Sequence, residues 1–123
     1  MKTIGIIGTR ERDSAEDFLA VWEAFEQLYE EGDTICSGLC PKGGDRFAVI
    51  LAQMYDTPVV WHRAKWRNER GEYNRYAGFA RNSDIAFDSG VLIACVNQRR
   101  KGGTEDTIRK FKRYHDPRKV FLV

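Results

Sequence analysis

The chain has 123 residues, of which 42% are hydrophobic and 31% are charged, a composition typical of a globular protein with one domain, expected here over residues 1–123. It excludes collagen-like, low-complexity and intrinsically disordered proteins. No apolar run approaches the ~20 residues that cross a bilayer, and the N-terminus does not follow a secretory signal pattern. We therefore expect a cytoplasmic protein without membrane contact.

Charge is nearly balanced overall but unevenly distributed. Residues 1–33 contain three basic and nine acidic side chains, whereas residues 97–123 contain nine basic and three acidic ones. A basic segment of this kind attracts anions such as nucleic acid. The alternatives are a solvated surface, or an acidic patch that meets a basic patch across a subunit contact.

The three cysteines are expected to be reduced thiols, because an odd number cannot all pair within the chain. Cys36 and Cys40 are four residues apart, and no second Cys/His pair follows. The spacing therefore does not predict a zinc site. Cys36 and Cys95 both end apolar runs, which favours a role as small core residues.

The first half of the chain alternates short apolar runs with amphipathic stretches. Residues 3–7 are apolar and rich in isoleucine, which is typical of a buried strand. Asp13 begins a capping-box-like sequence that predicts a helix, and Gly32 lies beyond its end. The next predicted elements are a strand over 34–36, a glycine-rich loop over 37–45, a helix with Phe47, Leu51 and Tyr55 on one face, and a strand over 58–61.

The second half continues this alternation after a polar, basic stretch at 62–75. The predicted elements are a helix over 76–87, an apolar strand over 90–96, a helix capped by Thr104 with Ile108, Phe111 and Tyr114 on its apolar side, and a strand over 120–123. Near-continuous apolar strands separated by helices indicate a parallel sheet with helices on both faces. The sequence therefore predicts an α/β fold with five strands and four helices.

In such sheets, ligands bind beyond the carboxyl ends of the strands, where the strand order reverses. Glycines there let backbone N–H groups approach a ligand, and helix N-termini favour anions. The loops after the first, second and fourth strands therefore predict a binding site for a phosphorylated ligand. The candidate ligand-binding residues are Gly8, Thr9, Arg10, Ser37, Gly38, Lys42, Gly43, Gly44, Asp45, Arg81, Asn82, Gly102, Gly103 and Thr104.

Two well-known phosphate-binding motifs do not fit these loops. The Gly-Ile-Ile-Gly sequence at 5–8 lacks the G-x-G-x-x-G pattern. Gly38 and Gly43 have the spacing of a Walker loop, but Gly44 and Asp45 occupy the positions of its Lys and Ser/Thr. ATP hydrolysis by a P-loop mechanism is therefore disfavoured.

In combination, the motifs resemble the SLOG superfamily, and more narrowly its small YspA-like branch. The resemblance covers nearly the whole chain, and Phe79 stands where the branch often has proline. The matching segments are Gly8-Thr9-Arg10, Ser37-Gly38, Lys42-Gly43-Gly44-Asp45-Arg46-Phe47-Ala48, Trp66, Ala77-Gly78, Arg81-Asn82 and Gly102-Gly103-Thr104 with Thr107.

The resemblance implies a Rossmann-like three-layer sandwich with a five-stranded, mostly parallel sheet. It further implies a protein that binds a nucleotide or nucleotide-derived ligand, as a sensor or by sequestering it. It places Gly8, Arg10, Ser37, Gly38, Gly43, Asp45, Arg81, Asn82, Gly103 and Thr104 in the pocket. We expect neither a cofactor nor a metal.

Hydrolysis of the N-glycosidic bond of a nucleoside monophosphate is the second hypothesis. The related "lonely guy" phosphoribohydrolases carry a glutamate at a set interval after their glycine loop, and Thr107 and Ile108 stand near that position here. Asp45 and Glu105 remain as candidate catalytic carboxylates. Their alternative roles are a helix cap for Asp45 and an interaction with the helix dipole for Glu105. The sequence leaves open whether the ligand is hydrolysed or only bound.

Single-stranded nucleic acid is the third hypothesis, since the related DNA-processing protein A family binds single-stranded DNA. Basic residues and rings that can stack on bases support it: Arg99, Arg100, Lys101, Trp61, Trp66 and Tyr76. A homo-oligomer, either a dimer or a tetramer, is also expected. Small relatives usually assemble, and the first helix presents aromatic residues that so small a chain is not expected to cover: Trp22, Phe25 and Tyr29.

Overall fold

A computed structural model describes residues 1–123 and contains a five-stranded sheet with four α-helices. The strands are β1 (Thr3–Gly8), β2 (Thr34–Ser37), β3 (Val59–Trp61), β4 (Val91–Cys95) and β5 (Val120–Leu122). The helices are α1 (Ala15–Leu28), α2 (Gly44–Tyr55), α3 (Ala77–Asp88) and α4 (Gly103–Tyr114), with a short 3₁₀ turn at Pro117–Lys119. The predicted order of elements is confirmed. No helix has the length and apolar character needed to cross a membrane.

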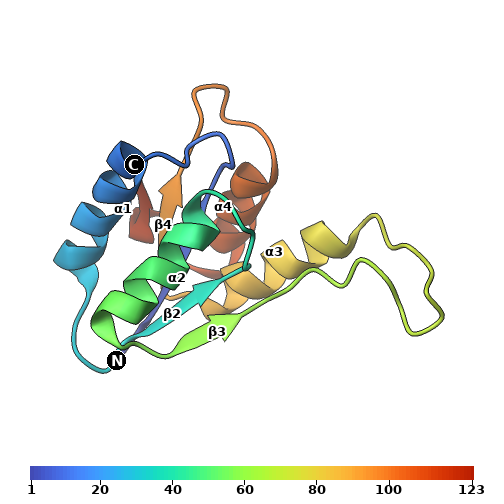
Figure 1. The fold of residues 1–123 in the computed structure, drawn as a ribbon, viewed down its shortest axis with the longest axis horizontal. Helices are drawn as coiled ribbons and strands as arrows, with labels where there is room; N and C mark the ends of the chain where they lie inside the picture. Colours follow the sequence, from blue (N-terminus) through green and yellow to red (C-terminus); the bar gives the residue numbers. More distant parts are fainter.

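The strands lie in the order β3-β2-β1-β4-β5, and every neighbouring pair is parallel. From β1 the chain builds outward to β2 and β3 on one side, then returns to β4 and β5 on the other. The order therefore reverses between β1 and β4. Helices α1 and α2 cover one face and α3 and α4 cover the other (Figure 1), which makes three layers.

Alternating residues of the central strands divide the core between the two faces. Ile4 and Ile6 of β1 pack with α1 and α2, whereas Ile7 packs with α3 and α4. All five residues of β4 are buried, as expected for a central parallel strand covered on both sides. Cys36 and Cys95 lie in this core, as predicted, and burial raises the pKa of the Cys36 thiol to about 12.

Two helix starts differ from the predicted ones. Ser14, rather than Asp13, caps α1: its side chain accepts from the N–H of Asp17, and the Asp17 carboxylate accepts from the N–H of Ser14. Asp13 instead accepts hydrogen bonds from the N–H of Gly43, which precedes α2, and from the side chain of Arg46 in α2. Thr104 does not cap α4, because the helix begins at Gly103, and Gly102, with φ of +101°, takes the cap position two residues before Thr104.

Two expectations about aromatic residues of the helices are wrong. The aromatic residues of α1 are covered within the chain: Phe25 is fully buried, Tyr29 stacks on it, and the Trp22 indole donates to the Tyr55 hydroxyl. They therefore leave no large apolar surface that calls for a partner. Tyr114 does not extend the apolar side of α4, since 53% of its surface is exposed.

The basic stretch before α3 forms a long loop that extends away from the sheet (Figure 1). A single antiparallel bridge joins Arg67 to Tyr73, and the rings of Trp66 and Tyr73 are stacked with centroids 6.1 Å apart. The loop returns to the body of the protein at the start of α3.

Candidate ligand-binding site

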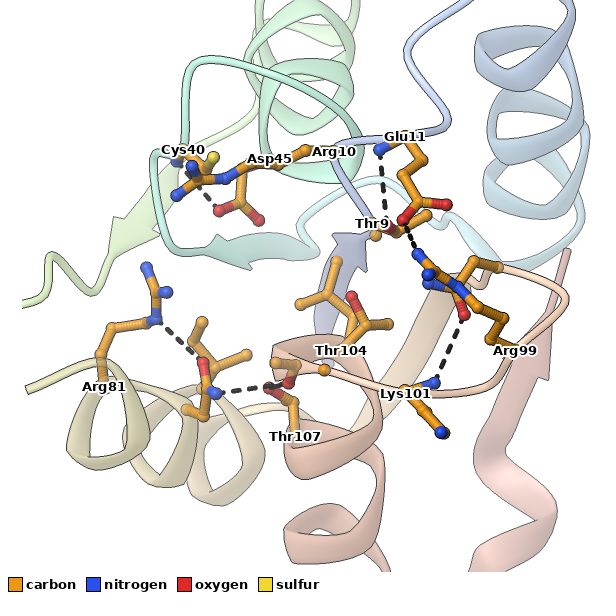
Figure 2. Close-up of a pocket in the computed structure, with 17 residues that line it drawn as sticks. Thr9, Arg10, Glu11, Cys40, Asp45, Arg81, Arg99, Lys101, Thr104 and Thr107 are labelled. Carbon is orange, nitrogen blue, oxygen red and sulfur yellow. Dashed lines mark hydrogen bonds and ion pairs between the residues drawn. The ribbon is translucent and has the colours of Figure 1, made fainter. Parts of the chain in front are cut away.

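A cavity of about 530 Å³ lies at the carboxyl ends of β1 and β4, and we call it the edge cavity. Its position agrees with the strand order, because the chain reverses direction across the sheet between these two strands. Figure 2 shows Asp45 and Arg81 on one side and the Glu11–Arg99 ion pair on the other, with Thr104 and Thr107 of α4 at its base.

Asp45, in the first turn of α2, is the buried acid of the edge cavity. Its carboxyl group accepts from the N–H of Cys40 at 2.9 Å and lies 2.8 Å from the hydroxyl of Ser37. Burial raises the pKa of Asp45 above its usual value, against the opposing effects of the Cys40 N–H, the Ser37 hydroxyl and the Arg81 charge. A side-chain cap of α2, the alternative role considered for Asp45, is not formed.

Arg81 and Asn82 connect α3 to the loops on either side of the cavity. The Arg81 guanidinium donates to the carbonyl of Gly38 at 3.1 Å and to the Asn82 amide oxygen at 3.0 Å. The Asn82 amide nitrogen donates to the carbonyl of Gly103 at 3.3 Å and to the Asp106 carboxylate at 3.2 Å. Arg81 makes no ion pair within 4.0 Å, so a carbonyl and an amide oxygen hold its guanidinium rather than a carboxylate.

The N-terminus of α4 opens onto the cavity with its N–H groups unoccupied by a side chain. Gly102 has a positive φ, and no side-chain hydrogen bond caps the helix. The first backbone bond of the helix runs from the N–H of Asp106 to the carbonyl of Gly102. The three N–H groups before it have no partner within the helix, and together with the helix dipole they favour an anion.

Basic side chains outnumber acidic ones around the edge cavity. Arg10, Arg81, Arg99 and Lys101 line it, against Glu11 and Asp45. The Arg99 guanidinium pairs with Glu11, whereas Arg10 and Lys101 pair with no carboxylate. The free charges therefore favour an anionic ligand.

Most of the predicted site residues do line the edge cavity, and five do not. Those that line it are Gly8, Thr9, Arg10, Asp45, Arg81, Asn82, Gly102, Gly103 and Thr104. Ser37, Gly38, Lys42, Gly43 and Gly44 lie outside its lining. The lining also contains residues that the prediction did not include: Ile7, Glu11, Cys40, Ile85, Asn97, Arg99, Lys101 and Thr107.

Two of the glycines outside the cavity, Gly43 and Gly44, serve close packing of the backbone. A Cβ on Gly44 would stand 2.2 Å from the carbonyl carbon of Ile7, and one on Gly43 would stand 2.4 Å from the carbonyl oxygen of Thr9. The Gly43 N–H also donates to Asp13 at 2.7 Å. These residues let the start of α2 pack against β1 and the residue after it, and this packing positions the residues that line the cavity.

Some of the missed residues had a signal in the sequence. Asn97, Arg99 and Lys101 belong to the loop after β4, and the rule that loops at carboxyl ends hold ligands applies to all of that loop. Glu11 follows the chosen Arg10 directly. Ile7 and Ile85 are core residues whose exposure to a cavity has no sequence signal.

A second cavity of about 600 Å³ adjoins the first, and we call it the Trp66 groove. Glu105, the other candidate catalytic carboxylate, lines this groove rather than the edge cavity, and Arg100 holds it at 2.8 Å. Of the two candidate acids, Asp45 alone faces the edge cavity.

Among solved structures, the fold is similar to that of DNA processing protein A from Helicobacter pylori, which was described for its single-stranded DNA binding mode. The two chains share 18% sequence identity at a TM-score of 0.66, over 98% of this chain and 64% of the other. The chain therefore spans less than two thirds of that protein's length. No protein-family model and no curated protein matches the sequence. The likeness shows that the protein has a Rossmann-like α/β fold.

Proposed function

We propose that this protein, as a member of the YspA-like branch of the SLOG superfamily, binds a nucleotide or nucleotide-derived ligand in the edge cavity and acts as a sensor or sequestering protein. One observation carries the proposal. Arg10, Arg81, Lys101 and the uncapped N-terminus of α4 converge on one cavity at the point where the strand order reverses. Its volume of about 530 Å³ lies in the range of small-molecule sites.

Each part of the edge cavity has a distinct role in this proposal. The free N–H groups of α4 bind a phosphate, since they are fixed donors that need no reorganisation. The Arg81 guanidinium offers its remaining donors to the same anion and is held in place by Gly38 and Asn82. Asp45 can bind a hydroxyl or a base amine, because it is the one buried carboxyl group that faces the cavity.

Thermal-shift screening of the chain tests the proposal, with nucleoside mono- and diphosphates and ADP-ribose as the probes. A compound at 100 times its dissociation constant should stabilise the protein by ~2.7 kcal/mol. The unphosphorylated nucleosides serve as the matched control and should give a much smaller shift. No shift with any nucleotide at millimolar concentration would overturn the proposal.

Single-stranded nucleic acid is a second candidate ligand. Two observations favour it: the structural neighbour was described for binding single-stranded DNA, and the Trp66 groove extends the edge cavity with further arginines and an exposed tryptophan ring. Fluorescence anisotropy with labelled oligodeoxythymidylate tests it. Binding that weakens steeply with salt is expected for a strand that contacts several basic residues, and unchanged anisotropy at low salt would exclude it.

We also propose that the chain assembles into a homo-oligomer. The support is electrostatic: α1 carries four acidic and no basic side chains on one face of the sheet, and α4 carries four basic and two acidic ones on the other. Opposite faces of two copies are therefore complementary. Light scattering should give a molar mass above the 14.2 kDa of one chain, and a mass of one chain at every concentration would contradict assembly.

A further inference from the structure

We propose that the Trp66 groove is a second subsite, which takes an aromatic base of a ligand whose first nucleotide unit lies in the edge cavity. The ligand class is then dinucleotide-like: two base-bearing units joined through phosphate. This inference rests on the proposed function, because it assumes a nucleotide in the edge cavity. It adds the identity of the ligand class and a site that the edge cavity alone does not contain.

The two cavities share one wall, and that wall is basic. Arg10, Arg81 and Lys101 line both, together with Asn82 and the glycine pair that starts α4. None of the three cations pairs with a carboxylate, and the α4 N-terminus lies among them. A ligand that occupies both cavities must cross this wall, so its phosphate linkage meets three positive charges and free N–H donors at the crossing.

The far side of the groove carries an aromatic ring that the fold covers only in part, since Tyr73 is stacked on Trp66 with the ring centroids 6.1 Å apart. Trp66 has 44% of its surface exposed, although burying a tryptophan would stabilise the chain. The ring lies against the start of α3 at Gly78, where a Cβ would stand 3.2 Å from its Cη2 atom. Glycine at this position therefore lets Trp66 approach the helix and line the groove. A ring that is held in position and exposed suits stacking on a base.

The groove's remaining charges do not compete for the phosphate. Arg100 is bound to Glu105, and Arg109 is bound to Asp106. Although burial opposes ionisation of Asp106, hydrogen bonds from Lys110 and Asn82 hold its pKa below its usual value. Among the residues that line the groove, two arginines thus balance two carboxylates, and Lys110, which also pairs with Asp106, lies outside the lining. The net positive charge of the lining therefore remains at the shared wall and at Arg75. In this arrangement the second base stacks on Trp66 inside the groove. The phosphate linkage contacts the unpaired cations of the shared wall, Arg10, Arg81 and Lys101.

A length series of adenine nucleotides tests the second subsite by calorimetry on the full chain. The probes are adenosine monophosphate, the dinucleotide pApA and an oligoadenylate of about ten units. The dinucleotide should bind about 5- to 150-fold more tightly than the monophosphate, the range expected for one base stacked on an aromatic ring. The oligoadenylate should bind more tightly than the dinucleotide only by the statistical factor that comes from its greater number of possible binding positions.

Trp66→Leu should abolish the advantage of the dinucleotide and leave the affinity for the monophosphate unchanged. The dinucleotide should also quench tryptophan fluorescence in the parent protein, and not in this variant. Phe87→Leu is the matched control, because Phe87 is an aromatic residue of α3 that is more exposed than Trp66, at 66% against 44%, and lines neither cavity. It should keep the full dinucleotide advantage.

The outcomes separate this inference from the proposed function. Equal affinities of the parent protein for the mono- and dinucleotide would overturn the second subsite and leave the edge cavity as a nucleotide site. Absence of binding by every probe would overturn both. Affinity that rises steadily from two to ten units, beyond the statistical gain, would overturn the dinucleotide-like ligand in favour of a single strand that follows the groove.

Discussion

The hydroxyl of Ser37 has one proton and two oxygen neighbours, the carbonyl of Ile6 at 2.7 Å and the carboxyl of Asp45 at 2.8 Å. It can donate to only one of them at a time. Both short contacts are satisfied together when Asp45 is protonated and donates to Ser37, while Ser37 donates to Ile6. Burial raises the pKa of Asp45, and both contacts of Ser37 are compatible with protonation of this carboxyl group.

Asp45→Asn should remove a pH dependence of stability. Because the pKa of Asp45 is higher in the folded protein than the usual 3.8, the folded state binds the proton more tightly. Its contribution to the free energy of unfolding is largest in acid and is lost as the pH rises from the unfolded pKa through the folded one. Asparagine keeps a similar shape and does not ionise.

Urea denaturation of the parent and the Asn variant from about pH 4 to about pH 8 measures this effect. The difference in unfolding free energy should shift in favour of the variant as the pH rises. Taking the difference removes the opposite slope that comes from acids with lowered pKa values, such as Asp33 and Asp106. Parallel curves would show that Asp45 titrates as it does in the unfolded chain.

Arg81→Lys and Arg81→Ala should weaken nucleotide binding as well as the fold. Lysine keeps the charge and loses the planar fork, and alanine should cost ~1.5–3 kcal/mol of binding free energy. The unliganded protein loses the hydrogen bonds to Gly38 and Asn82, at roughly 1 kcal/mol each. Calorimetry and thermal denaturation of both variants make the comparison.

Arg113→Ala provides the control for Arg81, because it removes the same charge from an exposed position of α4 outside both cavities. It should leave nucleotide affinity nearly unchanged. If the Arg81 variants bind nucleotide as the parent does and only their stability falls, Arg81 has a structural role that connects α3 to the loop after β2. It would then not belong to the ligand-binding site.

At the scale of elements, the contact between α2 and β1 depends on Gly44. A Cβ there would stand within 2.4 Å of three backbone atoms of Ile7 and Gly8, which cannot rotate away. Gly44→Ala should therefore push the helix off the strand and destabilise the fold by about 2 kcal/mol or more, as overpacking of a core does. Gly90→Ala is the matched control, since its nearest neighbour would lie 3.6 Å away.

Denaturant unfolding of the two alanine variants distinguishes a packing role from a ligand-binding role for Gly44. A large loss of stability for the first and a small change for the second is expected. Unchanged stability of Gly44→Ala together with lost nucleotide binding would instead make Gly44 a residue that approaches the ligand.

At the scale of the whole molecule, the acidic and basic segments lie on opposite sides of the sheet. Complementary faces on opposite sides pair head to tail, and such contacts do not close in a two-fold dimer. We predict that the mean molar mass in solution rises with protein concentration at low salt and falls towards one chain at about 0.5 M NaCl, where charges are screened within a few ångströms.

Light scattering across a salt series measures this, with Lys112→Glu/Arg113→Glu as the variant that weakens the basic face. The double variant should associate less than the parent at low salt. A mass that stays at two chains regardless of salt would contradict the electrostatic contact and indicate a closed, apolar interface.

Much of the fold was predictable from local properties of the sequence. The apolar run of β4, the glycines around the loops and the helical spacing in α2 each indicate their element without reference to distant residues. Shifts of one or two residues occur at element ends: Ser14 rather than Asp13 caps α1, Gly102 replaces Thr104 as the cap of α4, and α2 begins at Gly44, inside the predicted loop. There the alternatives differ by one or two residues, and the contacts of the neighbouring loop decide between them.

By itself, the sequence determined the order and type of the elements, the parallel character of the sheet and the edge at which polar loops gather. Only the tertiary structure decided which loops share a cavity, because the order β3-β2-β1-β4-β5 places the loops after β1 and β4 side by side. It also decided that Gly43 and Gly44 face backbone while Arg10 and Arg81 face open space. Periodicity is a property of near neighbours, whereas a cavity is made by residues whose closeness comes from the packing of the whole sheet.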